Sequence, residues 1–524
     1  MTSNARRSVG IDLGTSFSSL TCLDADLKPQ PVANAEGDFK TPSVVYFQEN
    51  GGAIVGRDAI EPGFSRPERF VANSKRFLGE PDVRWEIDGV IYTPVDIAAL
   101  VIRKLLEDAE PQVGLIEEAV ITVPAHFTSY QRQLTVEAGR QAGLTKVAIV
   151  NEPVAAALSY ALGEEGIVMS YLGQEYTILI YDLGGGTFDL SIVRYDRKQL
   201  RVLAASGERF LGGIDWDQCL LDRLADTALS THGIDFRADP QSLRRLAHKV
   251  EIAKRALSNP KIETATVLFE HGGAPLEFSV DRRDFEQLTG HLVARTRVLT
   301  EHLLESLEDE DMTWQHVDCI IPVGGCTRMP MIRTLLESLV EDGTAIRYLS
   351  PDLAIAQGAA LFAGILTSRN GERIVAGASP MADVLANYST RTVNANHLGV
   401  IVRHGDRRIN HVLIPKNTPL PASVNVVVGT FRPNQSRIKV RVVEGNSRSL
   451  GAGRSVCTCI VDHLPPNLPA NSLFDVSLTY DVDGLLQVMA THRDSGRVAT
   501  ASTLYAADEE DRPGSFGDPE GKFS

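Results

Sequence analysis

Residues 179–189 read LIYDLGGGTFD, and residues 8–18 read SVGIDLGTSFS. Both stretches are apolar runs that end in Asp-Leu-Gly and continue through a turn of small residues. The runs predict strands, and glycines in such turns let backbone N–H groups approach an anion closely. Successive N–H groups there form an anion-binding nest. The repeat therefore predicts two phosphate-binding turns from two similar halves, with Asp12 and Asp182 in matching places.

The residues of these turns define the first candidate site. They are Gly14, Thr15 and Ser16 in the first turn and Gly184, Gly185, Gly186 and Thr187 in the second. Carboxylates that face a polyphosphate can hold Mg²⁺ directly or through water, so Asp12 and Asp182 are the candidate metal ligands. For either turn alone, a tight turn of structural origin is the simpler interpretation. The chain holds no G-x-x-x-x-G-K-[ST] sequence, which excludes a P-loop.

A third element, IIPVGGCTRMPMI at 320–332, predicts a strand, a turn at Gly324 and Gly325, and a helix. A ligand can approach the backbone closely there, and an adenosine can pack near the helix N-terminus. Upstream, EIAKRALS at 251–258 places four polar residues on one helical face: Glu251, Lys254, Arg255 and Ser258. Such a stripe is usually a solvated face. Its composition also suits a guanidinium stacked on a purine, with the carboxylate and ammonium groups binding ribose or base edges.

Composition bounds the class of protein. The chain has 524 residues, of which 43% are hydrophobic and 23% charged, with a net charge of −15. These values are typical of a globular protein of several domains, and the negative charge argues against nucleic acid or an anionic membrane as the main partner. The six cysteines lack zinc-site spacing and are interpreted as buried small residues in a reducing compartment. No targeting segment is visible, which predicts a cytoplasmic location.

The sequence pattern divides the chain into four parts. Residues 1–372 alternate strand-like and helix-like segments, which predicts an α/β domain. Residues 397–506 are short Val- and Ile-rich runs between turns, which predicts an all-β sandwich. Residues 373–396 carry little apolar patterning and are interpreted as the linker, and 507–524 as a disordered tail.

Taken together, these motifs resemble the 70-kDa heat-shock protein chaperones of the DnaK type. The resemblance covers most of 8–506 and is carried by SKRFLG, VNEPVAAALSYAL, YDLGGGTFDLSI, LGGIDWD, EIAKRALS and VGGCTRMP, among others. Sugar kinases and actin share the paired Asp-Gly turns but lack NEPVAAAL and VPAHF. The resemblance implies an actin-like nucleotide-binding domain, duplicated and RNase H-like, followed by a β-sandwich that binds peptide.

The resemblance also implies roles for single residues. Asp12 and Asp182 would organise Mg²⁺, Thr15 and Thr187 would contact phosphates, and Lys75 would stabilise the γ-phosphate during hydrolysis. Glu152 would contact the metal-bound water network, and Arg328 and Asp352 join the nucleotide-binding residues. Pro124 and Arg132 would report the nucleotide state to the other domain. The peptide-site candidates are Val400, Val428, Phe431 and Ile438, each of which also fits an ordinary sandwich core.

We therefore expect an ATP-dependent chaperone that hydrolyses ATP and binds extended unfolded peptide, with ATP or ADP, Mg²⁺ and K⁺ as cofactors. The implied partners are unfolded polypeptides, a J-domain co-chaperone and a nucleotide exchange factor. No nucleic acid or membrane is expected, and the chain is expected to be a monomer.

Three departures from the family pattern support an alternative. The stretch aligned with the aliphatic interdomain linker reads YSTRTV (388–393), which cannot dock by burying aliphatic side chains. Residues 507–524 cannot form the family's helical lid, so we expect a lidless site that exchanges peptide quickly. Ala148 stands where the family has an arginine that engages J-domain partners. The alternative is a nucleotide-dependent binding or regulatory protein with a weak or uncoupled ATPase and no client refolding. A sugar kinase is disfavoured because no sugar-binding insert is present.

Overall fold

The computed structural model describes residues 7–163, 175–196, 198–271, 274–307, 312–340, 344–369, 380–404, 407–445 and 454–502. The chain forms two compact units, Met1–Ala125 with Thr135–Thr390, and His126–Leu134 with Arg391–Ser524. The predicted tail, 507–524, lies outside the described residues.

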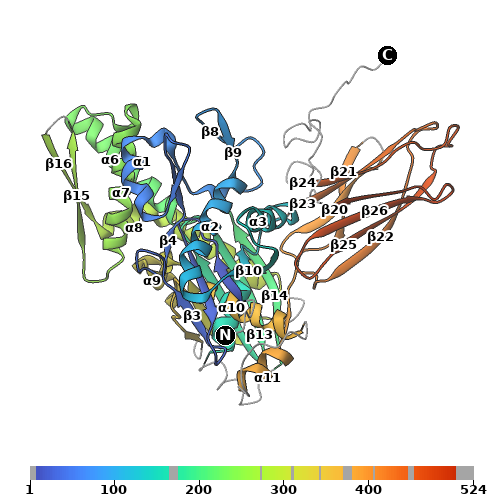
Figure 1. Ribbon diagram of the computed structural model, residues 1–524, viewed down its shortest axis with the longest axis horizontal. Helices are drawn as coiled ribbons and strands as arrows, with labels where there is room; N and C mark the ends of the chain where they lie inside the picture. Colours follow the sequence, from blue (N-terminus) through green and yellow to red (C-terminus); the bar gives the residue numbers. More distant parts are fainter. Residues whose placement is uncertain are drawn as a thin grey trace. The chain divides into compact units, whose positions relative to one another are not determined.

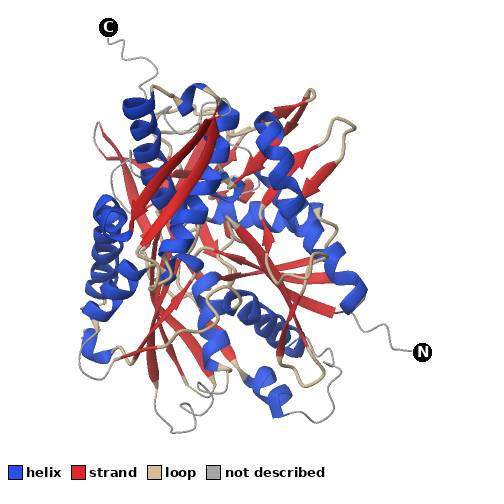
Figure 2. Cartoon of the chain, turned by 90° about the vertical axis from the view of Figure 1, so that its left-hand side faces the viewer, coloured by secondary structure: helices blue, strands red, loops and turns tan. Residues whose placement is uncertain are grey.

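The first unit is built on two sheets of matching topology (Figures 1 and 2). In the first sheet, β1 (Arg7–Asp12) pairs in parallel with β10 and antiparallel with β2. In the second, β12 (Tyr176–Leu183) pairs in parallel with β17 and antiparallel with β13. The sheet orders are β11-β10-β1-β2-β3 and β18-β17-β12-β13-β14-β19. The predicted α/β core with two similar halves is confirmed.

The remaining strands, with β4 (Thr41–Pro42) paired to β2, differ in burial: β2, β10, β13 and β17 are mostly buried, whereas β3, β18 and β19 are mostly half-buried or exposed. Their bounds are β2 Phe17–Leu23, β3 Pro29–Val32, β10 Ile116–Val123, β11 Lys146–Asn151, β13 Phe188–Tyr195, β14 Gln199–Glu208, β17 Cys319–Val323, β18 Ala345–Ile346 and β19 Ser389–Arg391. The α-helices of the described residues are α1 Ile60–Ser65, α2 Pro94–Val113, α3 Ser129–Gln141, α4 Glu152–Ala161, α6 Gly213–His232, α7 Pro240–Leu257, α8 Arg282–Glu305, α9 Pro330–Leu339, α10 Ala354–Arg369 and α11 Pro380–Asn387.

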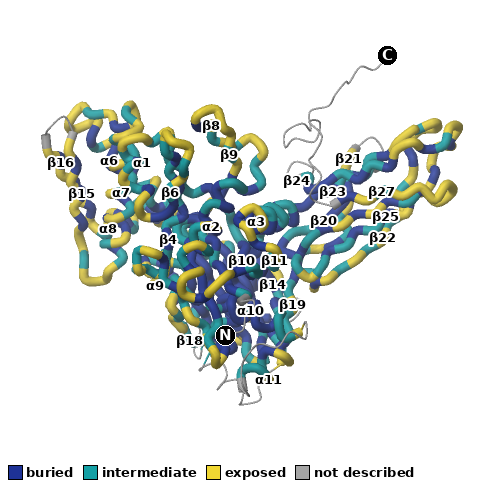
Figure 3. The backbone as a smooth tube through the Cα atoms, viewed as in Figure 1, coloured by how far each residue is buried: buried dark blue, intermediate teal, exposed yellow. Residues whose placement is uncertain are grey.

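Helix α10 packs directly on strand β1 and on helix α4, and it is mostly buried in Figure 3. Glycine makes both contacts possible. A Cβ atom at Gly358 would lie 1.7 Å from the carbonyl oxygen of Ala155, and one at Gly10 would lie 2.1 Å from the amide nitrogen of Ala360. The apolar sequence of α10 is thus explained by burial between layers. Within the described parts of the chain, no helix is long and apolar enough to cross a membrane.

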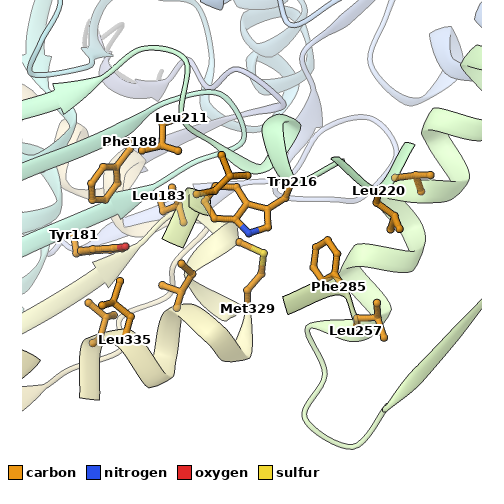
Figure 4. Close-up of a cluster of buried hydrophobic side chains, with 14 of the residues drawn as sticks. Tyr181, Leu183, Phe188, Leu211, Trp216, Leu220, Leu257, Phe285, Met329 and Leu335 are labelled. Carbon is orange, nitrogen blue, oxygen red and sulfur yellow. The ribbon is translucent and has the colours of Figure 1, made fainter. Parts of the chain in front are cut away.

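The second sheet continues into an arm made of α6, α7 and α8 and the hairpin of β15 (Thr264–His271) and β16 (Ala274–Asp281). Buried and exposed residues alternate along the hairpin, as Figure 3 shows, so only one face packs on the helices. The core between arm and sheet includes the fully buried indole of Trp216, which lies beside Met329 and near Phe285 in Figure 4.

The second unit contains a β-sandwich, as predicted. One sheet has the order β21-β20-β23-β24 and the other β22-β25-β26-β27. The strands are β20 His397–His404, β21 Arg407–Ile414, β22 Ala422–Gly429, β23 Ile438–Gly445, β24 Arg454–Val461, β25 Leu473–Tyr480, β26 Leu486–His492 and β27 Val498–Ser502. Inward-facing residues such as Leu398, Val442 and Phe474 are fully buried and form its core.

The segment interpreted as a linker is ordered where it is described. It contains α11 and β19, and β19 extends the second sheet beside β14. The Ser389 N–H donates to the Lys198 carbonyl at 2.8 Å, and the side chains of Leu385 and Tyr388 are buried. This part of the segment packs on the second sheet through its backbone, the Ser389 hydroxyl and two flanking side chains.

The packing of α10 yields a stability prediction. Gly358→Ala should lower the free energy of unfolding by about 2–3 kcal/mol, because the added methyl group meets backbone that cannot yield easily. Gly290→Ala is the matched control, since that glycine is also inside a helix but a Cβ there meets nothing within 4 Å. The control should gain about 0.5–1 kcal/mol from helix propensity. Calorimetric unfolding measures both, and equal effects of the two substitutions would contradict the packing.

Candidate functional site

A cavity of about 260 Å³ lies between the two sheets of the first unit. The structure brings together around it nearly all the residues predicted to bind nucleotide: Asp12, Gly14, Thr15, Ser16, Lys75, Glu152, Asp182, Gly184, Gly185, Thr187, Glu251, Lys254, Arg255, Ser258, Gly324, Gly325, Arg328 and Asp352. The remaining one, Gly186, lies beside the cavity, where a Cβ atom would come within 2.5 Å of the Thr15 side chain.

The second glycine turn is fixed from behind by three hydrogen bonds to its carbonyl groups. The Gly184 oxygen accepts from the Gly213 N–H at 3.0 Å, and the Gly185 oxygen accepts from the Ile214 N–H at 2.8 Å. The Gly186 oxygen accepts from Arg76 Nε at 2.9 Å. These donors do not line the cavity. The three carbonyl oxygens of this turn, which would repel an anion, therefore accept hydrogen bonds from groups outside the cavity.

The first turn is held by two serines. The Gly14 N–H donates to Ser18 Oγ at 3.1 Å, and Ser43 Oγ donates to the Gly14 carbonyl at 2.8 Å. The two turns approach each other so closely that a Cβ atom at Gly185 would lie 2.1 Å from Ser16 Oγ. A Cβ there would also lie 3.0 Å from the Ser16 Cβ atom, so a larger residue would force the Ser16 side chain to move.

A buried ion pair lies at the floor of the cavity. Lys75 Nζ is 2.6 Å from Glu152 Oε1, and each side chain is only 7% exposed. Lys75 belongs to the short 3-10 turn Ser74–Phe77, and Glu152 is the first residue of α4. Asp12, at the end of β1, accepts a hydrogen bond from Thr122 Oγ1 at 3.0 Å.

Three carboxyl groups are buried together at the floor of the cavity. Burial raises the pKa of Glu152 to about 7, although Lys75 opposes that rise. Burial, reinforced by the charge of Glu152, raises the pKa of Asp182 well above its ordinary value, and burial also raises the pKa of Asp12. Burial alone would lower the pKa of Lys75, but the charges of Glu152 and Asp12 outweigh it and raise that pKa. A cation bound beside these carboxylates would relieve their repulsion.

The donor set fits Mg²⁺ bound together with phosphate. In the part of the chain that the structure describes, no three His, Cys, Asp or Glu side chains form a metal-binding group. Mg²⁺ commonly keeps several waters and binds through one or two carboxylates plus substrate phosphates, and so it needs no complete protein cage. Asp12 and Asp182 suit that mode, because both line the cavity between the two glycine turns.

Two residues of the cavity rim, Lys40 and Phe17, were not predicted from the sequence. Lys40 Nζ is 3.0 Å from Asp352 Oδ1, and Arg328 contacts the other oxygen of Asp352 at 2.7 Å. Burial alone would raise the pKa of Asp352, but its hydrogen bond with Lys40 and the two cations outweigh burial and lower it. Lys40 and Arg255 also lie over the Phe17 ring, 5.3 and 5.7 Å from its centroid. No local sequence signal marks Lys40, because its partner is distant in the chain.

The polar stripe on α7 faces the cavity, but Lys254 is already engaged there. Its Nζ donates to the Gly213 carbonyl at 2.9 Å and to Asp217 at 2.6 Å. Arg255 is 3.7 Å from Glu251 and largely exposed, so its guanidinium remains accessible to a base. Lys254 thus joins α7 to the start of α6 as well as lining the cavity.

The two residues predicted to report nucleotide state fall in different units. Pro124 is buried directly after β10 in the first unit. Arg132 belongs to the second unit, where its Nε donates to the Phe127 carbonyl at 3.1 Å and its Nη1 to the Asp483 carbonyl at 3.4 Å.

The four peptide-site candidates differ in exposure. Val400 and Ile438 are buried in the sandwich core, and Val428 is partly buried against it. Phe431, which follows β22, is 57% exposed, and its N–H donates to Gln435 Oε1 at 2.6 Å. Of the four, Phe431 alone presents a large apolar surface to a ligand.

Comparison with known proteins covers most of the chain. A family model described as Hsp70 protein matches residues 8–83 and 79–511. The chaperone protein DnaK of Halobacterium salinarum is 35% identical over 493 residues, which cover 93% of this chain and 73% of that protein. Chaperone protein DnaK of Thermus thermophilus is 34% identical over 535 residues, 96% of this chain and 82% of the relative. Chaperone protein dnaK3 of Thermosynechococcus vestitus is 36% identical over 530 residues, 95% and 73% respectively.

The charge of the cavity floor predicts a pH dependence of stability. Because the pKa of Glu152 is raised in the folded protein, that state binds the proton more tightly than the unfolded chain. The unfolding free energy of the nucleotide-free protein should therefore fall as the pH rises from about 4.5 to about 7. Glu152→Gln should make this fall shallower, whereas Glu118→Gln, which changes a carboxylate in a surface pair with Lys146, should not. Melting temperatures across this range test it, and an unchanged slope in Glu152→Gln would contradict it.

Proposed function

The chain belongs to the Hsp70 family, and from that premise we propose that it is a molecular chaperone that hydrolyses ATP and binds extended segments of unfolded polypeptide. The observation that carries the proposal is the cavity between two Asp-Leu-Gly turns with a buried Lys75–Glu152 pair on its floor. Nothing in the comparisons favours the alternative of a regulatory protein with an uncoupled ATPase.

Different residues of the cavity have different roles in hydrolysis. The backbone of the two turns binds the phosphates, and Asp12 and Asp182 would hold Mg²⁺. Bound Mg²⁺ would supply charge neutralisation on the phosphate oxygens. Lys75 places its ammonium where negative charge develops on the transferring phosphoryl group. Glu152, held by Lys75, orients the water that attacks the γ-phosphorus as the bond to the ADP oxygen breaks.

The rim of the cavity suits the nucleoside. Arg255 and Arg328 offer guanidinium groups, and Gly324 and Gly325 allow close approach to the backbone. The proposed cofactors are accordingly ATP and ADP with Mg²⁺, and with K⁺ as a further ion. The proposed partners are unfolded polypeptides, a J-domain co-chaperone and a nucleotide exchange factor, for a monomer in the cytoplasm. Pro124 and Arg132 are proposed to report nucleotide state.

The role of Lys75 gives the first functional prediction. Lys75→Ala should slow ATP hydrolysis by about 10²–10³-fold, because it removes the positive charge that stabilises the transition state. ATP binding should persist, since both glycine turns remain. Lys104→Ala is the matched control, because Lys104 also forms carboxylate pairs but lies outside the cavity. Hydrolysis is measured by phosphate release and binding by fluorescent-nucleotide titration; near-normal turnover of Lys75→Ala would refute the role.

A chaperone should also couple its two sites. Unfolded peptide should raise the ATPase rate of the unmodified chain, and Phe431→Ser should weaken peptide binding, because it removes the exposed apolar side chain beside β22. Val427→Ser is the matched control. It also removes an exposed apolar side chain, 48% exposed on β22 itself, but at a position outside the four peptide-site candidates, and so it should leave peptide binding unchanged. Fluorescence anisotropy of a labelled apolar peptide measures binding. An ATPase rate that no peptide changes would favour the uncoupled alternative.

A further inference from the structure

One arginine outside the cavity joins the two halves of the first unit. Arg209 directly follows β14 of the second sheet, and it reaches the segment 76–80 that follows Lys75. Its Nε donates to the Arg76 carbonyl at 2.5 Å and its Nη2 to the Leu78 carbonyl at 3.4 Å, while its Nη1 pairs with Glu80. The planar fork of one guanidinium thus satisfies three acceptors on the C-terminal side of the turn Ser74–Phe77.

Arg76 continues the connection to the phosphate turn. Its side chain is buried, its Nε donates to the Gly186 carbonyl at 2.9 Å, and its Nη2 pairs with Asp215. Asp215 also accepts the Gly212 N–H at 2.8 Å, which fixes the start of α6. Arg76 is therefore held at its carbonyl by Arg209 and at its guanidinium by the second glycine turn and by α6.

An aromatic ring completes this arrangement. The Phe210 ring lies 5.4 Å from the Arg76 guanidinium carbon and 5.1 Å from that of Arg209. The ring is 47% exposed, so its contact with two cations explains its place better than core packing does. We call Arg76, Arg209 and Phe210 the arginine clasp.

The clasp acts on the residue beside it. Lys75 precedes Arg76 in the 3-10 turn, and its Nζ must remain 2.6 Å from Glu152 for the floor of the cavity to keep its geometry. No member of the clasp lines the cavity. A disturbance of Arg209 would therefore move Lys75 relative to the second phosphate turn without removing any group that contacts the nucleotide.

We propose that Arg209 is a positioning residue for ATP hydrolysis, which acts through Arg76 to hold Lys75 against the second phosphate turn. The inference rests on the proposed ATPase function and deepens it. A misplacement of a reacting group by about 1 Å can cost about 10²-fold in rate, so the clasp needs only a small displacement to matter.

The test is single-turnover hydrolysis of pre-bound ATP, with ATP affinity measured in parallel. Arg209→Ala should slow hydrolysis by about tenfold and change affinity by less than about threefold, because positioning affects the transition state most. Arg209→Lys keeps the charge and should recover part of the rate. Arg237→Ala is the matched control, since Arg237 also pairs with two carboxylates, Asp222 and Asp226, but contacts neither turn.

A double substitution separates positioning from a general structural role. In the Lys75→Ala background, Arg209→Ala should slow hydrolysis no further, since the group that it positions is gone. The same fold-loss in both backgrounds, or a normal rate in Arg209→Ala, would overturn this inference while leaving the ATPase function intact. Absence of turnover in the unmodified chain would overturn the proposed function and this inference with it.

Discussion

The ion pair between Lys75 and Glu152 is the constraint around which the first unit is built. Both side chains are nearly inaccessible, and Asp12 and Asp182 add negative charge to the same floor. Removing charges from water costs several kcal/mol per ion, and one lysine does not offset that cost for three carboxyl groups, so their pKa values rise and they bind protons more readily. A cation bound together with a nucleotide would stabilise the charged forms of these carboxyl groups at the floor.

The duplicated sheets explain how these charges meet. Asp12 and Asp182 lie at the ends of the equivalent strands β1 and β12, each with a parallel partner on one side and a hairpin on the other. The following turns then face each other across the cavity. Glycine allows them to come this close, because a Cβ at Gly185 would lie 2.1 Å from Ser16 Oγ and displace that side chain. Glycine likewise allows α10 to pack closely on β1 and α4, through Gly10 and Gly358. Close backbone contacts at glycine therefore occur both in the core and at the cavity.

The sequence predicts best where a function is carried by neighbouring residues. The Asp-Leu-Gly turns, the Gly-Gly turn and the α7 stripe are local motifs, and the structure brings their residues to one cavity. Lys40 and Arg209 could not be predicted in this way, because each acts through partners far away in the chain. The α7 stripe predicts that Lys254 binds ribose or base edges, but its spacing does not reveal that Lys254 pairs with Asp217. Periodicity predicts both fold classes, but α11 and β19 are too short and too polar to stand out.

The stretch YSTRTV shows why a polar sequence does not exclude docking. Strand addition uses backbone N–H and C=O groups, which every residue except proline supplies in full. The Ser389 N–H donates to the Lys198 carbonyl at 2.8 Å, a bond that any residue except proline can make, and its hydroxyl donates to the same oxygen at 3.3 Å. The side chains that fix the position of this strand are those that precede it. Leu385 is buried, and Tyr388 is 2% exposed and accepts a hydrogen bond from Arg369 at its carbonyl at 2.8 Å. Leu385, Tyr388, the strand backbone and the Ser389 hydroxyl thus hold this segment on the second sheet, and only two of these four contributions come from apolar side chains.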